Sequence, residues 1–245
     1  MVVQTRMEAR DLSLELRGRF TDLGCSSPLE VSVSYSWDEV TGEFAMNTEL
    51  LGPSACVARR SEFIAGRRLA NQGLAAIGFE EHLIARGPSR EPVWPAAIRG
   101  SITHTLGLAA AVVWRPDESD VSIGIDAERR GRIEKTDIGD AFTAGEREMM
   151  VSLSPLDRDL FSTVVFSAKE ALYKAQFPLT GQYIDYSEVS ISPTASSGTG
   201  FGRLELVLED PANVLKSFEC RLFYQCTGDF VVTGALVRAR QPKLK

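Results

Sequence analysis

The sequence predicts an α+β fold in two halves of about 120 residues, and three observations support this prediction. Strand-like and helix-like segments do not alternate regularly, which disfavours a doubly wound parallel sheet. Each half holds several strand-like segments around one long helical segment. The polar stretch R-P-D-E-S-D at 115–120 lies between the halves. It is therefore the best candidate for a linker.

The first half begins with a predicted hairpin. The run L-E-V-S-V-S-Y-S-W from Leu29 alternates apolar and polar residues, and F-A-M at 44–46 follows a turn as the returning strand. A helix is predicted from about Pro53 to Ile77, with Gly78 as its C-terminal stop.

The rest of the first half reads as a loop followed by a strand pair. Residues 86–95, R-G-P-S-R-E-P-V-W-P, are too rich in Pro and Gly for regular structure. Residues 100–105 and 108–114 are apolar and β-branched enough to predict two strands that turn near Gly107.

The second half opens on a strand and closes on a β-meander. The run V-S-I-G-I-D at 121–126 predicts a strand, and 128–137 predicts a charged loop. Helical periodicity predicts helices near 143–153 and, more strongly, 157–177. Residues 192–202 are small and polar, as in a loop. The meander strands are predicted at 203–209, 217–226 and 230–237.

Composition and charge exclude several classes of protein. The chain has 245 residues and a formal charge of −6, which argues against general nucleic-acid binding. No apolar run reaches membrane-spanning length, and charges come too early for a secretory signal, so we expect no membrane partner. The four cysteines are scattered without metal-binding spacing, as is typical of reduced thiols in a cytoplasmic protein.

Two acids lie at the end of the run V-S-I-G-I-D-A-E at 121–128. Residues two apart on a strand project from one face, so Asp126 and Glu128 present their carboxylates together. Paired anions favour a cation, and all-oxygen ligation suits Mg²⁺. From this motif alone, ordinary ion pairs with Arg129 and Arg130 are the simpler interpretation.

The strongest helical segment contains F-S-A-K-E-A-L-Y-K-A at 166–175. Glu170 and Lys174 are four residues apart and so share a helix face, with Lys169 beside them. Taken alone, this pair is also compatible with a solvated salt bridge.

Inward-pointing arginines mark the predicted helix at 53–77. Arg59 and Arg67 lie about 40° to either side of Phe63, the centre of its apolar stripe. Two guanidiniums there suit phosphate binding, or pairing with an internal carboxylate such as Glu62. The residues leave both interpretations open.

A histidine on a short strand is the fourth candidate. His104 lies in G-S-I-T-H-T, and His82 is the other histidine and is expected at the surface. A lone strand histidine is more often structural than catalytic, and no second histidine is placed to build a His-based metal site. Phosphate-loop, dinucleotide-binding and nucleophile-elbow motifs do not occur.

Together these motifs resemble a known family. R-R-S-E-F-I-A-G-R, E-P-V-W-P…G-S-I-T-H, G-I-D-A-E and F-S-A-K-E-A-L-Y-K-A follow in this order over residues 55–190. The sequence is similar to 4′-phosphopantetheinyl transferases of the surfactin type, which include enterobactin-synthase-like proteins. D-A-E and the later F-P-L-T resemble actinobacterial members.

The resemblance implies a fold and a reaction. The fold is pseudo-dimeric, with two similar halves that each pack a small antiparallel sheet on a long helix. The implied domains are 1–118, which binds coenzyme A, and 119–245, which binds Mg²⁺ and is catalytic, with the active site between them. Coenzyme A donates its phosphopantetheine arm to a serine of an apo acyl- or peptidyl-carrier domain, and 3′,5′-ADP is released. Mn²⁺ is a possible substitute metal, and a monomer is expected.

The resemblance also implies roles for residues. Asp126, Glu128 and Glu170 would be the Mg²⁺ ligands. Glu170 is the first choice of general base, acting directly or through a water, and Glu128 is the second; Lys174 would assist catalysis. The implied coenzyme A contacts are Arg59, Arg67, Arg86, Ser101, His104, Lys169 and Lys174.

Some features depart from the family pattern or leave alternatives. Thr103 and Thr105 replace the Ser and Cys that often surround the histidine, and the first lysine in the chain is Lys135. Carrier docking is expected at 132–153. Packing within the second half is an equally good interpretation of the apolar residues there, which are Ile138, Phe142, Met149, Met150 and Leu153. The alternative function is a non-catalytic module that binds coenzyme A.

Overall fold

A computed structural model describes residues 6–35, 57–79, 84–133, 139–194 and 200–241, except for the side chains of 57–59 and 139. The chain divides into two compact units. One, here called the N-terminal unit, comprises Met7–Asp117. The other, the C-terminal unit, comprises Glu118–Lys245 together with Met1–Arg6.

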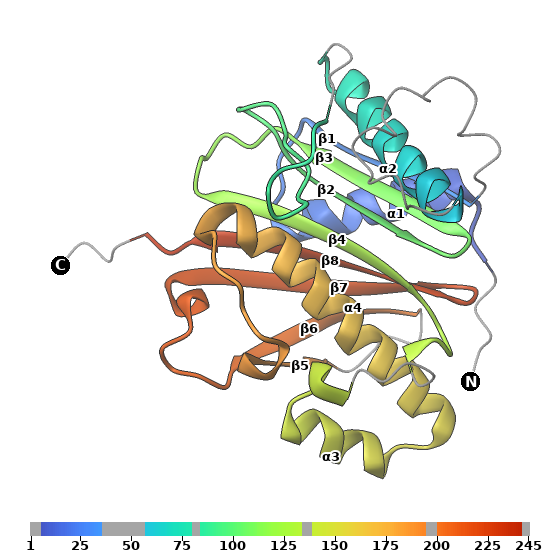
Figure 1. Cartoon of the computed structure of the whole chain (residues 1–245), viewed down its shortest axis with the longest axis vertical. Coiled ribbons are helices and arrows are strands. Elements are labelled where there is room, and N and C mark those ends of the chain that lie inside the picture. The colour runs from blue at the N-terminus through green and yellow to red at the C-terminus, as the bar shows by residue number, and fades with distance from the viewer. Residues whose placement is uncertain (1–5, 36–56, 80–83, 134–138, 195–199, 242–245) are drawn as a thin grey trace. The chain divides into compact units, whose positions relative to one another are not determined.

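The N-terminal unit holds one antiparallel sheet with three strands in the order β1-β3-β2 (Figure 1). Its elements are α1 (Ala9–Leu23), β1 (Leu29–Ser34), α2 (Val57–Ala76), β2 (Arg99–Thr105) and β3 (Leu108–Trp114). The strand predicted to start at Leu29 is confirmed, and so are the strands predicted at 100–105 and 108–114. The predicted return strand at 44–46, the first residues of the predicted helix at 53–77 and His82 lie outside the described residues.

Helix α1 was not predicted. Its buried residues Leu12, Leu16, Phe20 and Leu23 form an apolar stripe at helical spacing, and α1 packs against β1. Gly24 ends the helix with φ at 109°, a left-handed conformation that glycine adopts without steric cost. The stripe contains only four residues in fifteen, which made the signal weak.

Helix α2 contacts all three strands of its sheet. Its buried residues Ala65, Leu69, Ala70 and Leu74 form a core with inward residues of β3 such as Val113. The predicted inward stripe of the helix is therefore confirmed, and Arg67 lies within it at 6% exposure.

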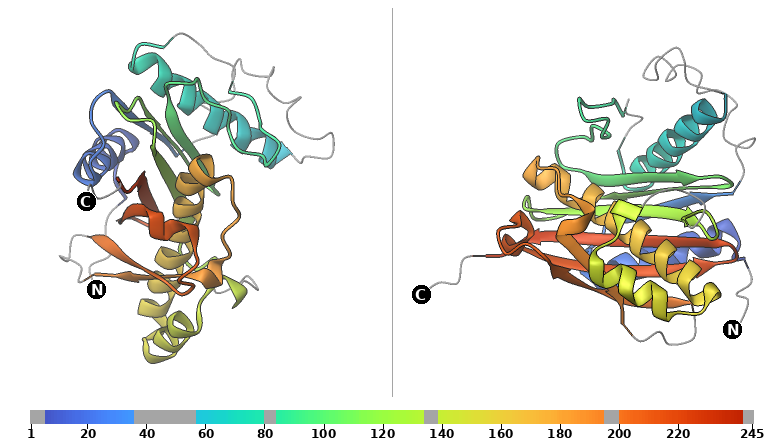
Figure 2. Two further views of the ribbon diagram at one scale, coloured as in Figure 1. Left: turned by 90° about the vertical axis from the view of Figure 1, so that its left-hand side faces the viewer. Right: turned by 60° about the horizontal axis from the view of Figure 1, so that its bottom comes forward.

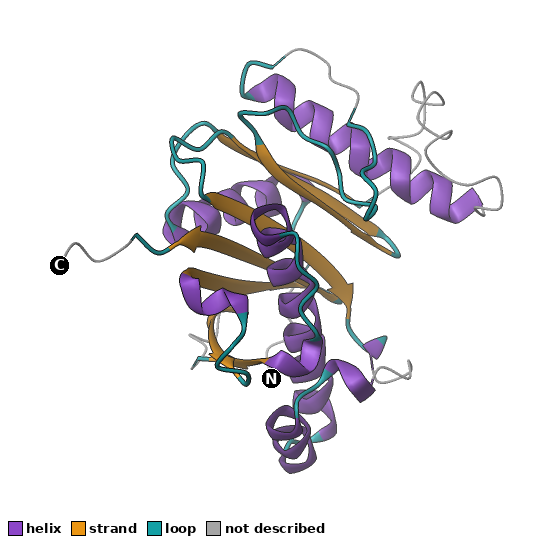
Figure 3. Ribbon diagram, turned by 60° about the vertical axis from the view of Figure 1, so that its left-hand side comes forward, coloured by secondary structure: helices purple, strands orange, loops and turns teal. Residues whose placement is uncertain are grey.

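The C-terminal unit holds an antiparallel sheet of five strands in the order β4-β8-β7-β6-β5 (Figure 2). Two helices, α3 and α4, and three short 3₁₀ helices, η3 to η5, complete its described part (Figure 3). Its elements are β4 (Val121–Arg129), η3 (Gly139–Ala141), α3 (Ala144–Ser152), α4 (Pro155–Thr180), η4 (Tyr186–Glu188), β5 (Val189–Pro193), β6 (Phe201–Leu208), η5 (Val214–Ser217), β7 (Phe218–Thr227) and β8 (Phe230–Ala239).

Helix α4 lies across one face of this sheet and contacts β4 and β8 most extensively (Figure 1). Gly124 permits the close approach, because a Cβ built there would lie 1.9 Å from the Ala171 carbonyl oxygen and 2.8 Å from the Ala175 nitrogen. The buried core between helix and sheet includes Ala171 and Ala175. The small residues of α4 thus bring the helix close to the end of β4.

The α+β prediction is confirmed, because the described part of each unit holds an antiparallel sheet with a long helix, α2 or α4, packed on it. The predicted loop at 192–202 is wrong at both ends, since β6 begins at Phe201 and β5, which pairs with β6, runs from Val189 to Pro193. Its five residues are too few to show a clear period of two. Strand β4 runs beyond the predicted strand at 121–126, as far as Arg129.

Two further observations bear on the class of protein. No helix in the described part of the chain is long and apolar enough to cross a membrane. Among the described residues, Cys25, Cys220 and Cys226 do not form disulfides.

Candidate active site

The end of β4 brings two carboxylates to the face of the strand that α4 covers. Gly124, Asp126 and Glu128 alternate with Ile125 and Ala127 along the strand, so the first three share the face toward α4. Asp126 is 5% exposed, and Glu128 is half-buried. The predicted common face of the two acids is therefore present.

Asp126 is held by side chains from α4. Lys174 Nζ donates a hydrogen bond of 2.7 Å to Asp126 Oδ1, and Ser167 Oγ donates one of 2.8 Å to Asp126 Oδ2. Ser167 in turn lies 2.9 Å from the hydroxyl of Thr233 on β8. These contacts keep a buried carboxylate satisfied, as burial requires.

Lys174 retains one donor beyond its internal contacts. Its ammonium group has three N–H donors, and two of them reach Asp126 and the Ile125 carbonyl oxygen at 3.2 Å. Its side chain is 27% exposed. Among the described residues, the third N–H has no hydrogen-bond acceptor.

Glu128 lies in a site with excess negative charge. Burial raises the pKa of its carboxyl to about 7, repulsion from Asp126 acts in the same direction, and Arg132 and Lys174 partly oppose both. Arg132 Nη1 lies 3.3 Å from Glu128 Oε2. Glu170 also repels Glu128, so the three acids interact electrostatically.

The simpler interpretation, in which the two acids pair with the next two arginines, is not what the structure shows. Arg129 pairs with Asp229 at 3.5 Å, and Arg130 pairs with Asp159 at 3.2 Å. Glu128 is instead contacted by Arg132. The carboxylates are thus not neutralised by the arginines that follow them directly in sequence.

Glu170 accepts a hydrogen bond from Tyr186, which was not among the predicted site residues. The Tyr186 hydroxyl donates to Glu170 Oε1. Burial raises the pKa of that hydroxyl above its ordinary value, and the Glu170 carboxylate adds to the effect, so the hydroxyl stays protonated and acts as donor. No motif signals this contact, because Tyr186 follows the helix across a turn and an irregular segment.

The contacts of Lys169 differ from the diphosphate contact that was predicted for it. Its ammonium group donates to Glu146 Oε2 at 2.6 Å, to the Tyr186 carbonyl oxygen at 2.9 Å and to the Ala141 carbonyl oxygen at 3.0 Å. These contacts use all three donors, and the residue is 2% exposed. The cavity beside it measures about 10 Å³, room for at most about one water. The predicted contact of Lys169 with a diphosphate is therefore corrected to an internal ion pair.

The donor chemistry of this site fits a hard divalent cation. Asp126, Glu128 and Glu170 supply only oxygen, and their mutual repulsion favours a positive charge among them. As the side chains lie, however, no three metal-binding residues of the described part are grouped closely enough to hold an ion. Asp126 and Glu170 are oriented by hydrogen bonds from Lys174, Ser167 and Tyr186 instead.

In the N-terminal unit, His104 projects from β2 toward α2. Its Nδ1 lies 3.5 Å from Glu62 Oε2, and both side chains are about one-fifth exposed. Glu62 is thus the neighbour of the histidine. Ser101 is 3% exposed and, three residues away on the same strand, lies on the opposite face from His104. The coenzyme A contacts predicted for Ser101 and His104 therefore stay predictions, made from opposite faces of β2.

Arg67 and Arg86 lie close enough to repel each other. Burial, and secondly the charge of Arg86, lowers the pKa of Arg67 to about 10, so its guanidinium stays charged near neutral pH. Arg67 Nε donates to the Ile84 carbonyl oxygen at 3.2 Å, and its guanidinium lies 4.5 Å from the Phe63 ring centroid. No described carboxylate pairs with Arg67, so the interpretation as an ion pair with Glu62 is not supported for this residue, and phosphate binding stays a prediction. The side chain of Arg59 lies outside the described residues.

The predicted docking segment shows both packing and exposure. Phe142 is 5% exposed and Met150 packs on the core of the C-terminal unit, so packing is the correct interpretation for these two residues. Met149 is 49% exposed. Ile138 lies outside the described residues.

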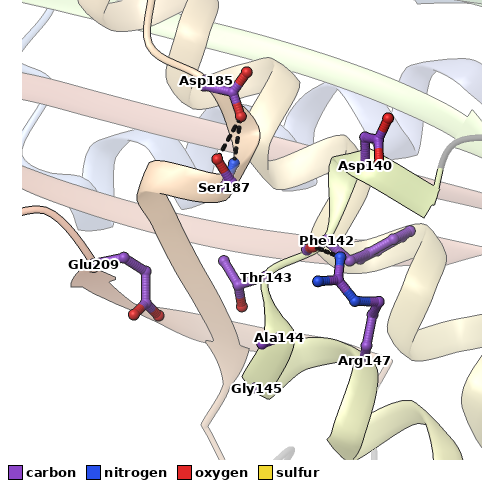
Figure 4. Close-up of a pocket in the computed structure, with 9 residues that line it drawn as sticks. All are labelled: Asp140, Phe142, Thr143, Ala144, Gly145, Arg147, Asp185, Ser187 and Glu209. Atoms are coloured by element: carbon purple, nitrogen blue, oxygen red, sulfur yellow. Dashed lines mark hydrogen bonds between the residues drawn. The ribbon is translucent and has the colours of Figure 1, made fainter.

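A pocket of about 540 Å³ opens at the N-terminus of α3 (Figure 4). Thr143, which caps α3, and Arg147 line it. Three acids, Asp140, Asp185 and Glu209, surround it, so its charge does not favour an anion. None of the residues predicted for catalysis, metal binding or coenzyme A binding lines this pocket.

Comparison with known proteins gives two family matches. The 4′-phosphopantetheinyl transferase N-terminal domain matches residues 48–114. The 4′-phosphopantetheinyl transferase superfamily matches residues 122–226. The second match contains α4 and all of β4 except its first residue, and therefore the acids and Lys174 described above.

Individual relatives include two described as 4′-phosphopantetheinyl transferases and one described as an enterobactin synthase component. The chain is 34% identical over 163 residues to 4′-phosphopantetheinyl transferase Npt of Nocardia iowensis, which covers 63% of this chain and 71% of that protein. It is 33% identical over 147 residues to 4′-phosphopantetheinyl transferase Svp of Streptomyces mobaraensis, covering 60% of this chain and 59% of the relative. It is 36% identical over 137 residues to enterobactin synthase component D of Escherichia coli, covering 54% of this chain and 62% of that protein. The chain thus spans about three fifths of the length of Svp and of enterobactin synthase component D.

Proposed function

The chain belongs to the 4′-phosphopantetheinyl transferase family, and on that premise we propose that it transfers the 4′-phosphopantetheine arm of coenzyme A to a serine of apo carrier domains. In this reaction the serine oxygen forms a bond to the β-phosphorus of coenzyme A. The bond from that phosphorus to the leaving 3′,5′-ADP breaks, and the serine proton passes to a base. The observation that best supports the proposal is the cluster of Asp126, Glu128, Glu170 and Lys174 where β4 meets α4.

Glu170 is the proposed base. Tyr186 engages its Oε1, and among the described residues its Oε2 has no hydrogen-bond partner. A carboxylate oxygen of this kind can accept the serine proton within hydrogen-bond reach. Glu128 remains the second choice, since its raised pKa also suits proton transfer near neutral pH.

Lys174 is the proposed cation for the diphosphate. Its third N–H is not used within the described part of the chain, and its ammonium group is fixed by Asp126 and the Ile125 carbonyl. A fixed positive charge stabilises the negative charge that develops on the leaving oxygen. In the N-terminal unit, Arg67, Arg86 and His104 are proposed to bind coenzyme A phosphates, and the separation into a coenzyme A unit and a catalytic unit belongs to the same proposal.

Asp126, Glu128 and Glu170 would hold Mg²⁺, for which Mn²⁺ could substitute. When bound, the metal would supply positive charge to the diphosphate oxygens. Asp126 can contribute while it still accepts from Lys174 and Ser167, because each carboxylate oxygen has two lone pairs. Glu170 would bind the metal through Oε2, because Oε1 accepts from Tyr186.

The partners proposed are apo acyl-carrier and peptidyl-carrier domains, and the site of action proposed is the cytoplasm. The test is to incubate the protein with coenzyme A, Mg²⁺ and one carrier of each type, and to measure the mass of the carrier. We expect a gain of one phosphopantetheine arm on at least one carrier, lost on addition of EDTA and restored by excess Mg²⁺. Unchanged mass for both carrier types under these conditions would contradict the proposed activity.

A further inference from the structure

Tyr186 contacts α4 at three points. Its ring packs against Phe166, with centroids 6.0 Å apart and planes tilted by 42°. Its carbonyl oxygen accepts from Lys169 Nζ at 2.9 Å, and its hydroxyl donates to Glu170. Residues 166, 169 and 170 lie on one helix face, because they are three and four positions apart. The ring, backbone and hydroxyl of Tyr186 are therefore all fixed relative to the helix that carries Glu170.

The contact with Lys169 is itself rigidly held. Glu146 accepts from Lys169 and from the Thr143 backbone N–H through Oε2, and from the Ile191 N–H at 2.7 Å through Oε1. Glu146 is 3% exposed. This buried ion pair thus ties the start of α3 and strand β5 to α4 beside Tyr186.

The segment that bears Tyr186 is also fixed. Asp185 caps η4 by accepting from the Ser187 N–H at 2.9 Å, and Glu188 accepts from the Asp185 N–H at 2.9 Å. Glu188 further accepts from Asn213 Nδ2 at 2.9 Å. A side chain on such a segment loses little additional freedom when its hydroxyl donates to a carboxylate.

We propose that Tyr186 is a positioning residue for Glu170, with its hydroxyl fixing Oε1 so that Oε2 is presented in one orientation to metal and substrate. Without that donor the carboxylate can rotate about its side-chain bonds, and the favourable arrangement becomes one of several. A hydrogen bond to a charged group is among the stronger ones in proteins, so its loss affects a carboxylate measurably. This inference rests on the proposed function, because it assigns a role within the same site.

The test compares Tyr186→Phe with Tyr183→Phe. The first keeps the ring that packs on Phe166 and removes only the hydroxyl, and the second removes a hydroxyl from a residue that is 69% exposed. We expect Tyr186→Phe to lower kcat about tenfold and leave the KM for coenzyme A unchanged, because the hydroxyl acts on the reacting carboxylate. Tyr183→Phe should retain wild-type kcat.

A second readout measures the metal alone, without substrates. Mn²⁺ affinity is followed by electron paramagnetic resonance, and we expect Tyr186→Phe to weaken it several-fold. In the background of Glu170→Gln, adding Tyr186→Phe should weaken Mn²⁺ no further, because a residue that acts through Glu170 has no effect once Glu170 is changed. Additive losses in the double variant, or a Tyr186→Phe protein equal to wild type in both readouts, would overturn the inference.

These outcomes separate the inference from the proposed function. If the wild type modifies carriers and Tyr186→Phe matches it, only the role of Tyr186 fails. If the wild type modifies no carrier while the Mn²⁺ data follow the predicted pattern, the proposed function fails and the positioning of Glu170 stands. Melting temperatures of both tyrosine variants within a few degrees of wild type show that the comparison concerns folded protein.

Discussion

Lys169 and Lys174 lie five residues apart on α4, and their ammonium groups donate to different acceptors. Lys169 is buried, and its three N–H groups go to Glu146 and two backbone carbonyls. Lys174 is 27% exposed and uses two of its three donors internally. The helical period places them 140° apart, so one faces the core beside α3 and the other faces the end of β4. Of the two lysines, Lys174 is the one with an exposed side chain and a donor not used among the described residues, which is why it carries the proposed contact with the diphosphate.

The buried pair gives a stability prediction. Lys169→Met leaves Glu146 without its charged partner in the core, and breaking such a pair by removing one member costs about 3–5 kcal/mol. We expect urea unfolding to show a loss of this size, with part of it recovered in Lys169→Met/Glu146→Leu. A fully stable Lys169→Met protein with a raised KM for coenzyme A would favour the diphosphate contact that was first predicted.

The hydroxyl of Ser167 is expected to contribute less to stability than the buried ion pair does. Ser167→Ala removes one of the donors to the buried Asp126, and a buried acceptor that loses its partner costs about 1–3 kcal/mol. The matched control is Ser152→Ala, since Ser152 is exposed and donates to Met149 within α3. We expect the control to lie within about 0.5 kcal/mol of wild type by urea unfolding. Equal stability of the two variants would mean that Ser167 does not support Asp126.

At the scale of elements, the close contact of α4 with β4 positions the site. A methyl group at Gly124 would overlap the backbone of α4 at Ala171. We expect Gly124→Ala to destabilise the protein by at least about 1–3 kcal/mol, because neither the strand nor the helix backbone can move independently.

Gly145 on α3 is the control for that substitution. A Cβ at Gly145 meets nothing within 4 Å, so Gly145→Ala should leave stability unchanged or raise it by up to about 1 kcal/mol. Thermal or urea unfolding measures both. If Gly124→Ala were as stable as Gly145→Ala, the tight packing of α4 on β4 would be incorrect.

Elements with strong periodicity were predictable, and weak ones were not. The strong apolar pattern of 157–177 located α4 to within three residues at each end. Helix α1 carries its stripe on few residues, and the short β5 depends on pairing with β6. Such elements are stabilised by tertiary partners, which a single sequence does not reveal.

At the scale of the whole molecule, the candidate residues fall into two sets. Asp126, Glu128, Glu170 and Lys174 belong to the C-terminal unit, whereas Arg67, Arg86 and His104 belong to the N-terminal unit. Local periodicity predicted which acids share a face, because that depends only on the strand and helix repeats. The burial of Lys169 and the role of Tyr186 depend on segments distant in sequence, so they required the structure.

The central claim is that the carboxylates between β4 and α4 carry out phosphopantetheine transfer. The most direct measurement compares Glu170→Gln with Glu205→Gln, an exposed acid on β6, for the mass gain of an apo carrier with coenzyme A and Mg²⁺. We predict that Glu170→Gln lowers the rate by at least about 100-fold, the lower range for loss of a general base, while Glu205→Gln matches wild type. A Glu170→Gln protein that modifies the carrier at the wild-type rate would contradict the account.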